Sequence, residues 1–360
     1  MIEKILIENY RGIEKLEVNN FKKYNLFVGD NSSCKTTLLE ALYSSFLINP
    51  SLDIITVANY RGMTVKKDNI HNLIYNADLN KNIVFTLNDN VTTIIKINEE
   101  KTLENSNLKG NSQQGFNNLN SSVFNQGRTF LFNITKKIEN QVISNIDYYL
   151  NNYSTGIDVQ HNYQTARFSN MDLTKFNIFF ENNKAWLSPY IKNFETAEKV
   201  KNIIENKKKD ELLSLINRFE PEIDDIFSDG QDILLSKKNI DKMLLISSFG
   251  NGLLAIVNII SHIVLNDVKF LFIDEIESGI HYLNYKNFCS SLIEITNLKN
   301  IQLFISTHSK EFLKIFYEEI EKTEEDISLY RFQKVNGKLK DIYYSKDEVI
   351  TSIKNNWEVR

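Results

Sequence analysis

The chain has 360 residues, 42% of them hydrophobic, with 23 Phe and 16 Tyr, which allows a large buried core and excludes a disordered chain. A formal net charge of −4 provides no global basic field, so charge does not support nucleic acid as a partner, although binding in a local groove stays open. The two cysteines, Cys34 and Cys289, exclude a disulfide framework, and no signal peptide opens the sequence, so we expect a cytoplasmic protein. The longest apolar run, Leu253 to Leu265, is too short to span a bilayer, and no membrane partner is expected.

The predicted elements begin with a first lobe over residues 1–98. Edge strands are expected near Lys4–Glu8 and Leu16–Phe21, and a short apolar strand at Asn25–Val28. After a loop and an amphipathic helix, the segments Asn82–Leu87 and Val91–Ile97 alternate apolar and polar residues, which predicts a β-hairpin.

The apolar strand breaks at Gly29 and leads to a lysine and two threonines that open the helix. Backbone N–H groups at such a helix start face an anion, so the segment predicts a phosphate-binding loop for ATP. Lys35 would reach the outer phosphates, and Thr36 would ligate Mg²⁺. The loop residues expected to contact the nucleotide are Asn31, Ser32, Ser33, Cys34, Lys35, Thr36 and Thr37.

Cys34 occupies the position where the usual loop pattern has its second glycine. Cysteine is small enough to leave room for phosphate in the loop. The incomplete motif alone does not distinguish a loop that binds nucleotide from a chance match or from a loop that has lost binding. A helix N-terminus and the neighbouring Lys35 both stabilise a thiolate, which predicts a reactive cysteine, and a buried, inert side chain is the alternative. Cys289 is expected in the core.

Residues 99–235 are expected to form a largely helical insertion. Its polar segment 101–128, rich in Asn, Ser, Gln and Gly, predicts a flexible loop or linker. Helical patterns extend over Lys136–Tyr153 and Thr196–Arg218, and a hydrophobic patch lies near Phe176–Tyr190.

The second lobe, residues 236–360, contains three further polar segments. Ser248 and Gly250 precede the apolar helix, where exposed N–H groups form a second anion-binding end, although a simple helix cap is the alternative. A buried strand ends in Asp274 and Glu275, which would support the metal and deprotonate the attacking water. His308 follows another buried strand, Ile301–Ser306. Together with the phosphate-binding loop, these segments indicate a nucleotide hydrolase.

The order and spacing of these motifs resemble those of ABC-type AAA ATPases related to the heads of SMC and RecF proteins, and especially the OLD-like group. The resemblance covers Ile5 through Leu42 and roughly Leu244 through Ser309, and the segment from Asp274 to His281 is similar to the family's D-E-P-E-x-G-L-H, with Ile276 replacing its proline. The segment from Ser328 onward is similar to the family's closing strands. The resemblance implies an α/β ABC-type P-loop ATPase head, with a mixed β-sheet flanked by helices and split by the insertion.

The resemblance also implies a mechanism. Such heads dimerise around two ATP molecules, so Ser248 and Gly250 would act on the partner subunit's nucleotide. Glu275 would be the catalytic base, His308 would sense the γ-phosphate, and Arg11 would lie near the nucleotide. No glutamine stands between Thr37 and Asn98 to complete the metal shell as in many ABC proteins.

Three functions are compatible with this reading. The first is an ATP-driven switch that controls a separate effector, a nuclease or toxin, in bacterial antiviral defence. OLD-type nucleases continue into a nuclease domain, whereas this sequence ends at Arg360, so the effector is expected on another chain. The second is a RecF- or SMC-like DNA-binding ATPase in repair, and the third is a non-hydrolysing, nucleotide-dependent interaction protein. The first two imply a homodimer or higher homo-oligomer.

Overall fold

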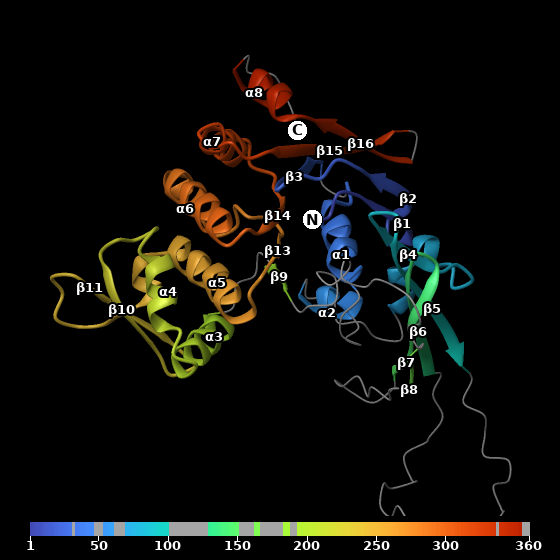
Figure 1. Ribbon diagram of the computed structural model, residues 1–360, viewed down its shortest axis with the longest axis horizontal. Coiled ribbons are helices and arrows are strands. Elements are labelled where there is room, and N and C mark those ends of the chain that lie inside the picture. Colours follow the sequence, from blue (N-terminus) through green and yellow to red (C-terminus); the bar gives the residue numbers. More distant parts are fainter. Residues whose placement is uncertain are drawn as a thin grey trace, which may run out of the picture.

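The computed structural model describes residues 1–30, 33–46, 53–60, 69–100, 129–150, 162–165, 183–187, 193–335 and 338–354. Over these ranges the chain forms a seven-stranded, a six-stranded and a three-stranded sheet, with helices between and beside them (Figure 1).

The strands are β1 (Ile5–Tyr10), β2 (Ile13–Val18), β3 (Tyr24–Gly29), β4 (Ile83–Leu87), β5 (Val91–Glu100), β6 (Thr129–Ile138), β7 (Gln141–Leu150), β8 (Asn162–Thr165), β9 (Lys184–Leu187), β10 (Ile223–Ser228), β11 (Ile233–Lys237), β12 (Leu244–Leu245), β13 (Phe270–Ile273), β14 (Gln302–Ser306), β15 (Ile327–Val335) and β16 (Lys338–Tyr344). The α-helices are α1 (Lys35–Ser44), α2 (Asp53–Tyr60), α3 (Asn193–Glu205), α4 (Lys209–Ile216), α5 (Asn251–Asn266), α6 (Tyr285–Leu298), α7 (Lys310–Ile320) and α8 (Lys346–Lys354). Short 3₁₀ turns include η1 (Ile70–Leu73), η2 (Tyr75–Ala77), η4 (Ile246–Phe249) and η5 (Tyr282–Asn284).

The six-stranded sheet has the order β16-β15-β3-β14-β13-β9. Its strands are parallel from β15 to β9, and β16 is antiparallel to β15. Every residue of β13 and β14 is buried, which is typical of parallel strands covered by helices on both faces. The strands expected before Asp274 and His308, and the closing strands, are therefore confirmed.

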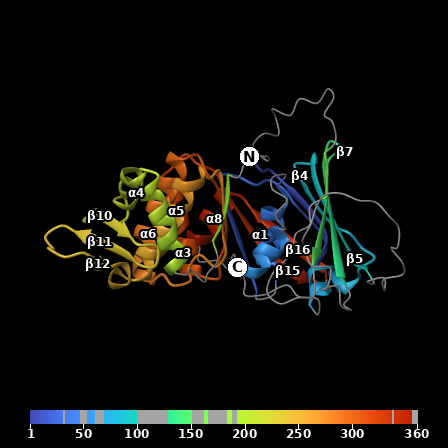
Figure 2. The same ribbon diagram turned by 90° about the horizontal axis from the view of Figure 1, so that it is seen from below.

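The six-stranded sheet separates two hydrophobic cores. Helices α5, α6 and α7 cover one face, whereas α1 lies on the other face, between this sheet and the seven-stranded antiparallel sheet (Figures 1 and 2). Because β3, β13 and β14 run in parallel, their carboxyl ends lie at one edge of the sheet. This edge carries Gly29, Asp274 and Thr307.

The seven-stranded sheet has the order β2-β1-β4-β5-β6-β7-β8. The hairpin expected from the two alternating segments is confirmed, because β4 and β5 pair antiparallel. The expectation of an edge position holds for β2 but is wrong for β1, which pairs with both β2 and β4.

The helix expected over Lys136–Tyr153 is wrong, because this region contributes to the β6–β7 hairpin. Glu139 and Asn140 connect the two strands with φ values of 47° and 68°, as a two-residue hairpin turn of the primed type requires. Buried residues recur at every second position of β6, up to Ile138. Burial in this segment therefore follows the two-residue period of a strand, and the insertion is not largely helical.

The second helical pattern, Thr196–Arg218, is confirmed as two helices, α3 and α4. Lys207 lies between them with φ 59°, a left-handed conformation that ends α3. The polar segment 101–128 lies outside the described residues, as does most of the patch Phe176–Tyr190, from which the structure describes β9.

The expected insertion contributes strands to both large sheets. The lobe boundary expected at residue 98 falls inside β5, which pairs with β6 over its whole length. In the six-stranded sheet, β9 pairs in parallel with β13, the strand that ends before Asp274. Strands from the expected insertion therefore belong to the same two sheets as the strands of the two expected lobes.

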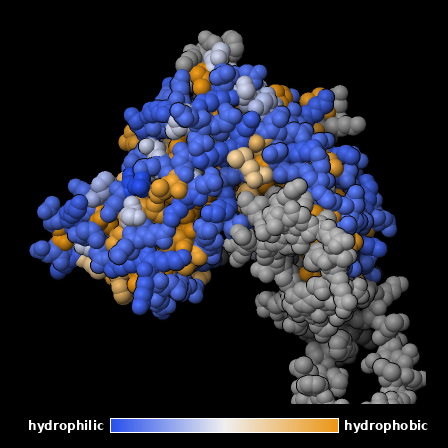
Figure 3. Space-filling view, viewed as in Figure 1, coloured by the Kyte–Doolittle hydropathy of each residue, from blue (hydrophilic) through white to orange (hydrophobic). Residues whose placement is uncertain are grey.

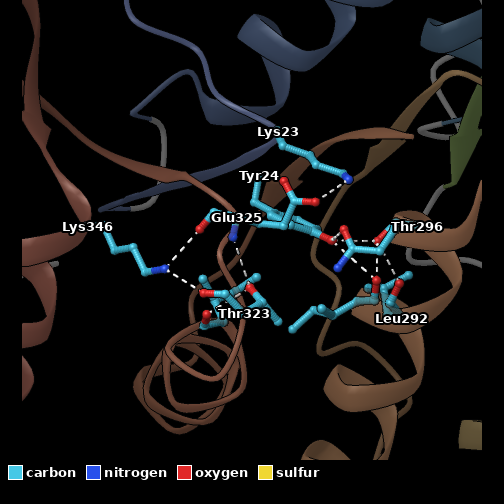
Figure 4. Close-up of polar contacts among 10 residues, drawn as sticks. Lys23, Tyr24, Leu292, Thr296, Thr323, Glu325 and Lys346 are labelled. Atoms are coloured by element: carbon cyan, nitrogen blue, oxygen red, sulfur yellow. Dashed lines mark hydrogen bonds and ion pairs between the residues drawn. The ribbon is translucent and has the colours of Figure 1, made fainter. Parts of the chain in front are cut away.

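A polar network joins β3 to the C-terminal elements (Figure 4). The Tyr24 hydroxyl donates to Asn297 Oδ1 at 2.7 Å and lies 3.0 Å from Thr296 Oγ1 on α6. Lys346, the first residue of α8, donates to the carbonyl oxygens of Thr323 and Glu325 at 3.1 and 2.9 Å. The Tyr24 contacts hold the start of β3, the strand that leads to the phosphate-binding loop, against α6.

Two buried lysines close the C-terminal end of α1. Lys184 Nζ donates to the Tyr43 carbonyl at 2.7 Å and pairs with Asp53 Oδ2 at 2.6 Å. Lys136 Nζ donates to the Phe46 carbonyl. Cations at this end of a helix oppose its negative dipole. Burial, with a smaller contribution from Lys184, lowers the pKa of Lys136 to about 8, although Asp53 acts in the opposite direction.

This cluster predicts a pH dependence of stability. Lys136 titrates near pH 8 in the folded chain and near its ordinary value of 10.5 when unfolded, so between these values the unfolded chain binds more protons. The free energy of unfolding should therefore rise with pH across this window, by up to about 3 kcal/mol from this group. Urea unfolding of wild type and Lys136→Met at pH 7.5, 9 and 10.5 measures it. The rise should be smaller in Lys136→Met and unchanged in the control Lys137→Met, and equal rises in all three would contradict it.

Candidate functional site

The phosphate-binding loop begins at Gly29, the last residue of β3. Its φ is +135°, and a Cβ atom there would lie 2.3 Å from the Phe332 carbonyl oxygen, so only glycine fits this position. The Ser33 N–H donates to the Asp30 carbonyl at 3.2 Å, and α1 begins two residues later. Asn31 and Ser32 lie outside the described residues.

Cys34 adopts the backbone conformation of the glycine that it replaces. Its φ and ψ are 65° and 19°, in the left-handed region, which costs a non-glycine residue about 1–2 kcal/mol. Its sulfur packs against the β1–β2 turn, since a Cβ atom at Gly12 would lie 3.0 Å from Cys34 Sγ. The turn containing Arg11 therefore lies against Cys34.

The two thiols differ in exposure. Cys34 is half-buried at the loop, whereas Cys289 is fully buried and burial raises its pKa well above the ordinary value. We expect iodoacetamide to modify Cys34 faster than Cys289, and bound ATP to protect Cys34, because reactivity follows access and thiolate character. Mass spectrometry after limited alkylation measures both rates. Equal labelling of Cys34 with and without ATP would contradict the placement of its thiol at the nucleotide.

Lys35 folds back over the loop. Its Nζ donates to the carbonyl oxygens of Gly29 and Asp30 at 2.9 and 3.0 Å and to Ser33 Oγ at 3.2 Å. Burial lowers the pKa of Lys35, while Asp274 and Asp30 oppose the shift. An anion bound in the loop would supply the negative charge that favours the ammonium form.

Asp274, which follows the carboxyl end of β13, accepts hydrogen bonds from two hydroxyl groups. Thr36 Oγ1 donates to Asp274 Oδ1 at 3.0 Å, and Ser306 Oγ donates to the same oxygen at 2.5 Å. Ser306 Oγ also accepts the Glu275 N–H at 2.8 Å, and Glu275 has a φ of 47°. Ser306 thereby holds the side chain of Asp274 and the backbone of Glu275 against the end of β14.

The Thr36–Asp274 pair fits a magnesium ion. Both groups provide hard oxygen donors, and Mg²⁺ is commonly held by one or two protein ligands together with substrate phosphates. Over the ranges that the structure describes, no group of three or more His, Cys, Asp or Glu side chains could hold a metal by itself. A magnesium ion held by this pair would take its remaining ligands from substrate phosphates and water.

The segment after β14 is tied to Glu277. Its carboxylate accepts the Thr307 hydroxyl at 2.7 Å and the His308 N–H at 2.6 Å. This places the backbone of His308 at the same sheet edge as Asp274 and Glu275. His281 lies further along the chain, where its Nδ1 accepts the Leu283 N–H at 3.4 Å as an N-cap.

Arg11 lies in the β1–β2 turn, beside the helix of the phosphate-binding loop. Its Nε lies 3.1 Å from Glu40 Oε2 on α1, and its backbone N–H donates to the Leu73 carbonyl at 3.0 Å. The contact between Gly12 and Cys34 places this turn against the phosphate-binding loop, and the expected position of Arg11 near the nucleotide stays a prediction.

Ser248 and Gly250 lie on exposed surface at the start of α5. Gly250 has a φ of 87° and precedes the first residue of the helix, where N–H groups without helical partners face outward. A Cβ atom at Gly279 would lie 3.7 Å from Asn251 Cβ, so the segment after the carboxylates packs beside this helix start. The expected helix after the serine-glycine segment is confirmed.

The structure thus brings together Lys35, Thr36, Asp274 and Glu275, with His308 and Arg11 around them. The residues that connect them, Ser306, Glu277 and Glu40, are not among the site residues that the sequence predicts. For Ser306 and Glu277 the sequence contains a weak indication of a role in the site, because each lies within three residues of a predicted site residue. The signal for Glu40 was absent, since a glutamate in an amphipathic helix is ordinary.

Residues 1–313 match the family model described as AAA ATPase domain. An "ATP/GTP phosphatase" of Helicobacter pylori is 26% identical over 335 residues, covering 88% of this chain and 87% of that protein. The "DNA replication and repair protein RecF" of Alkaliphilus oremlandii is 22% identical, covering 87% and 95%.

Among solved structures, the SMC head domain from Thermotoga maritima is similar at 14% identity and a TM-score of 0.45, covering 95% of this chain and 98% of that one. An Smc head from Pyrococcus furiosus, bound to the C-terminal domain of ScpA, is similar at 11% identity and a TM-score of 0.47, covering 99% of each chain.

The fold and the motif order define an ABC-type P-loop ATPase head. The chain belongs to the AAA ATPase domain family and is an ATP hydrolase. In the part of the chain that the structure describes, no helix is both long enough and apolar enough to cross a membrane.

Proposed function

We propose that ATP is hydrolysed with Mg²⁺ at the sheet edge formed by the ends of β3, β13 and β14. The observation that carries this assignment is the 3.0 Å bond between Thr36 Oγ1 and Asp274 Oδ1, because it joins the phosphate-binding loop to the carboxylate strand. Lys35 and the loop N–H groups bind the phosphates, and Thr36 and Asp274 hold the metal ion. An ion held there would supply positive charge to balance the charge that develops on the phosphate oxygens.

Glu275 is the proposed catalytic base. It follows Asp274 directly, and its N–H is fixed by Ser306 Oγ at 2.8 Å, so its carboxylate starts from a defined backbone position. Its role is to orient a water molecule and accept its proton. His308, held through its backbone by Glu277, would contact the γ-phosphate.

Ser248 and Gly250 are proposed to complete the nucleotide site of a second subunit. Support comes from their exposure at the α5 N-terminus and from the exposed apolar side chains beside them, including Leu245 (44% exposed) and Leu283 (71%). Hydrophilic side chains cover most of the surface seen in Figure 3, with apolar side chains gathered around α5. Exposed apolar side chains next to a polar motif are typical of a protein–protein contact.

The biological role that we propose is an OLD-like, ATP-driven switch. The homodimer would form around ATP and control a separate effector, a nuclease or toxin, in bacterial antiviral defence. This proposal rests on the resemblance of the motifs, because a fold alone does not specify a partner.

Light scattering on the Glu275→Gln variant tests the dimer. A variant that binds but does not hydrolyse ATP should double its particle mass when ATP and Mg²⁺ are added, and ADP should have a smaller effect. Removal of Mg²⁺ by EDTA is the control for the metal. An unchanged mass with ATP, for a protein that binds ATP, would exclude dimerisation driven by the nucleotide.

A second candidate is a DNA-binding ATPase in repair, favoured by the similarity to a protein named RecF. Binding through phosphate contacts weakens steeply with salt. Fluorescence anisotropy with duplex DNA at several salt concentrations, with and without ATP, separates the candidates. ATP-dependent affinity with a strong salt slope would favour repair over the effector switch.

A further inference from the structure

A buried cluster of three side chains surrounds the β1–β2 turn. The Tyr10 hydroxyl donates to Glu40 Oε2 at 3.0 Å. Arg11 Nε lies 3.1 Å from the same oxygen and 3.2 Å from the Tyr10 hydroxyl, so the three groups form a closed triangle. The Arg11 guanidinium also lies 5.6 Å from the centre of the Tyr10 ring.

The charges of this cluster are matched inside the protein. Glu40 and Tyr10 are fully buried, and the Arg11 side chain is 11% exposed. Burial, followed by the charge of Glu40, raises the pKa of Tyr10, so its hydroxyl keeps its proton and donates. One carboxylate therefore faces one guanidinium, which is the arrangement that a buried ion pair requires.

One nitrogen of the Arg11 guanidinium takes no part in these contacts. Arg11 Nη2 is buried and has no hydrogen-bond partner, although a guanidinium can donate from all of its N–H groups. Buried donors without a partner are rare in native proteins and call for an explanation, such as an absent ligand. The contacts of Nε with the Tyr10 hydroxyl and the Glu40 carboxylate fix the plane of the guanidinium, and thereby the direction of Nη2.

The cluster lies against the phosphate-binding loop. Glu40 is on α1, the helix that begins with Lys35, and Gly12 contacts the Cys34 sulfur. We propose that Glu40 and Tyr10 are positioning residues that hold Arg11 with its Nη2 directed to a phosphate oxygen of ATP. This assignment rests on the nucleotide site proposed above. Arg11 would contact the nucleotide, whereas Glu40 and Tyr10 act through Arg11.

A double-mutant cycle tests the proposal. Dissociation constants for Mg²⁺–ATP are measured in the Glu275→Gln background, so that binding is read without turnover. Arg11→Gln and Glu40→Gln should each weaken binding by about tenfold, and the double variant should be no weaker than Arg11→Gln. Tyr10→Phe, which removes one hydrogen bond and keeps the ring, should weaken binding less, and only when Arg11 is present.

The control is Glu14→Gln, which removes the same charge at an exposed position of β2 and should leave affinity unchanged. Additive losses in the Arg11 and Glu40 variants would overturn the proposal, because they would mean that Glu40 acts independently of Arg11. If Glu40→Gln does not fold, the cycle of Tyr10→Phe with Arg11→Gln replaces it. Additive losses of ATP affinity in that cycle would likewise overturn the proposal. A parent protein that fails to bind ATP would overturn the nucleotide site itself, which distinguishes the two failures.

Discussion

Replacing Glu275 by glutamine should reduce ATP turnover by about 10²–10⁴-fold, the usual contribution of a positioned general base, while ATP binding remains. The amide keeps the size of the side chain but does not accept the proton of water at neutral pH. Steady-state phosphate release measures turnover, and equilibrium binding of a fluorescent ATP analogue measures affinity.

The matched control is Glu324→Gln, which makes the same chemical change at an exposed position that is not among the site residues. Its turnover should equal that of wild type. Wild-type turnover in Glu275→Gln would exclude Glu275 as the base. A loss of binding together with turnover would instead assign the residue to holding the nucleotide.

The second large effect is expected from complementation between two inactive variants. Ser248→Arg should block the partner's site, and Lys35→Ala should disable its own loop, so each protein alone should lose turnover. In a symmetric dimer, mixing them creates heterodimers with one intact composite site, and about a quarter of wild-type turnover should return if subunits exchange.

In the control mixture, Lys35→Ala is replaced by the double variant Lys35→Ala/Ser248→Arg. This protein cannot supply an intact Ser248 to the partner's nucleotide site. No turnover should return in that mixture. Full activity of Ser248→Arg, or recovery that is equal in both mixtures, would show that Ser248 does not act across a subunit contact.

The motifs of the site could be read from the sequence because each is encoded locally. A continuous apolar run followed at once by polar residues predicts a buried strand and the groups at its end, as for β13 and Asp274. The same local logic identified β14 with His308, and α5 after Gly250. ATP hydrolysis followed from these segments without knowledge of how they meet.

Only the tertiary structure decided how the middle of the chain folds and which residues support the site. Residues 129–150 form the β6–β7 hairpin, and β6 also pairs with β5 across a long gap in sequence, a pairing that the local pattern does not report. Ser306 connects Asp274 to Glu275, and Glu40 meets Arg11, through contacts between residues about 30 positions apart. A side chain's partner depends on where two elements meet in space, whereas periodicity reports only which of its faces is buried.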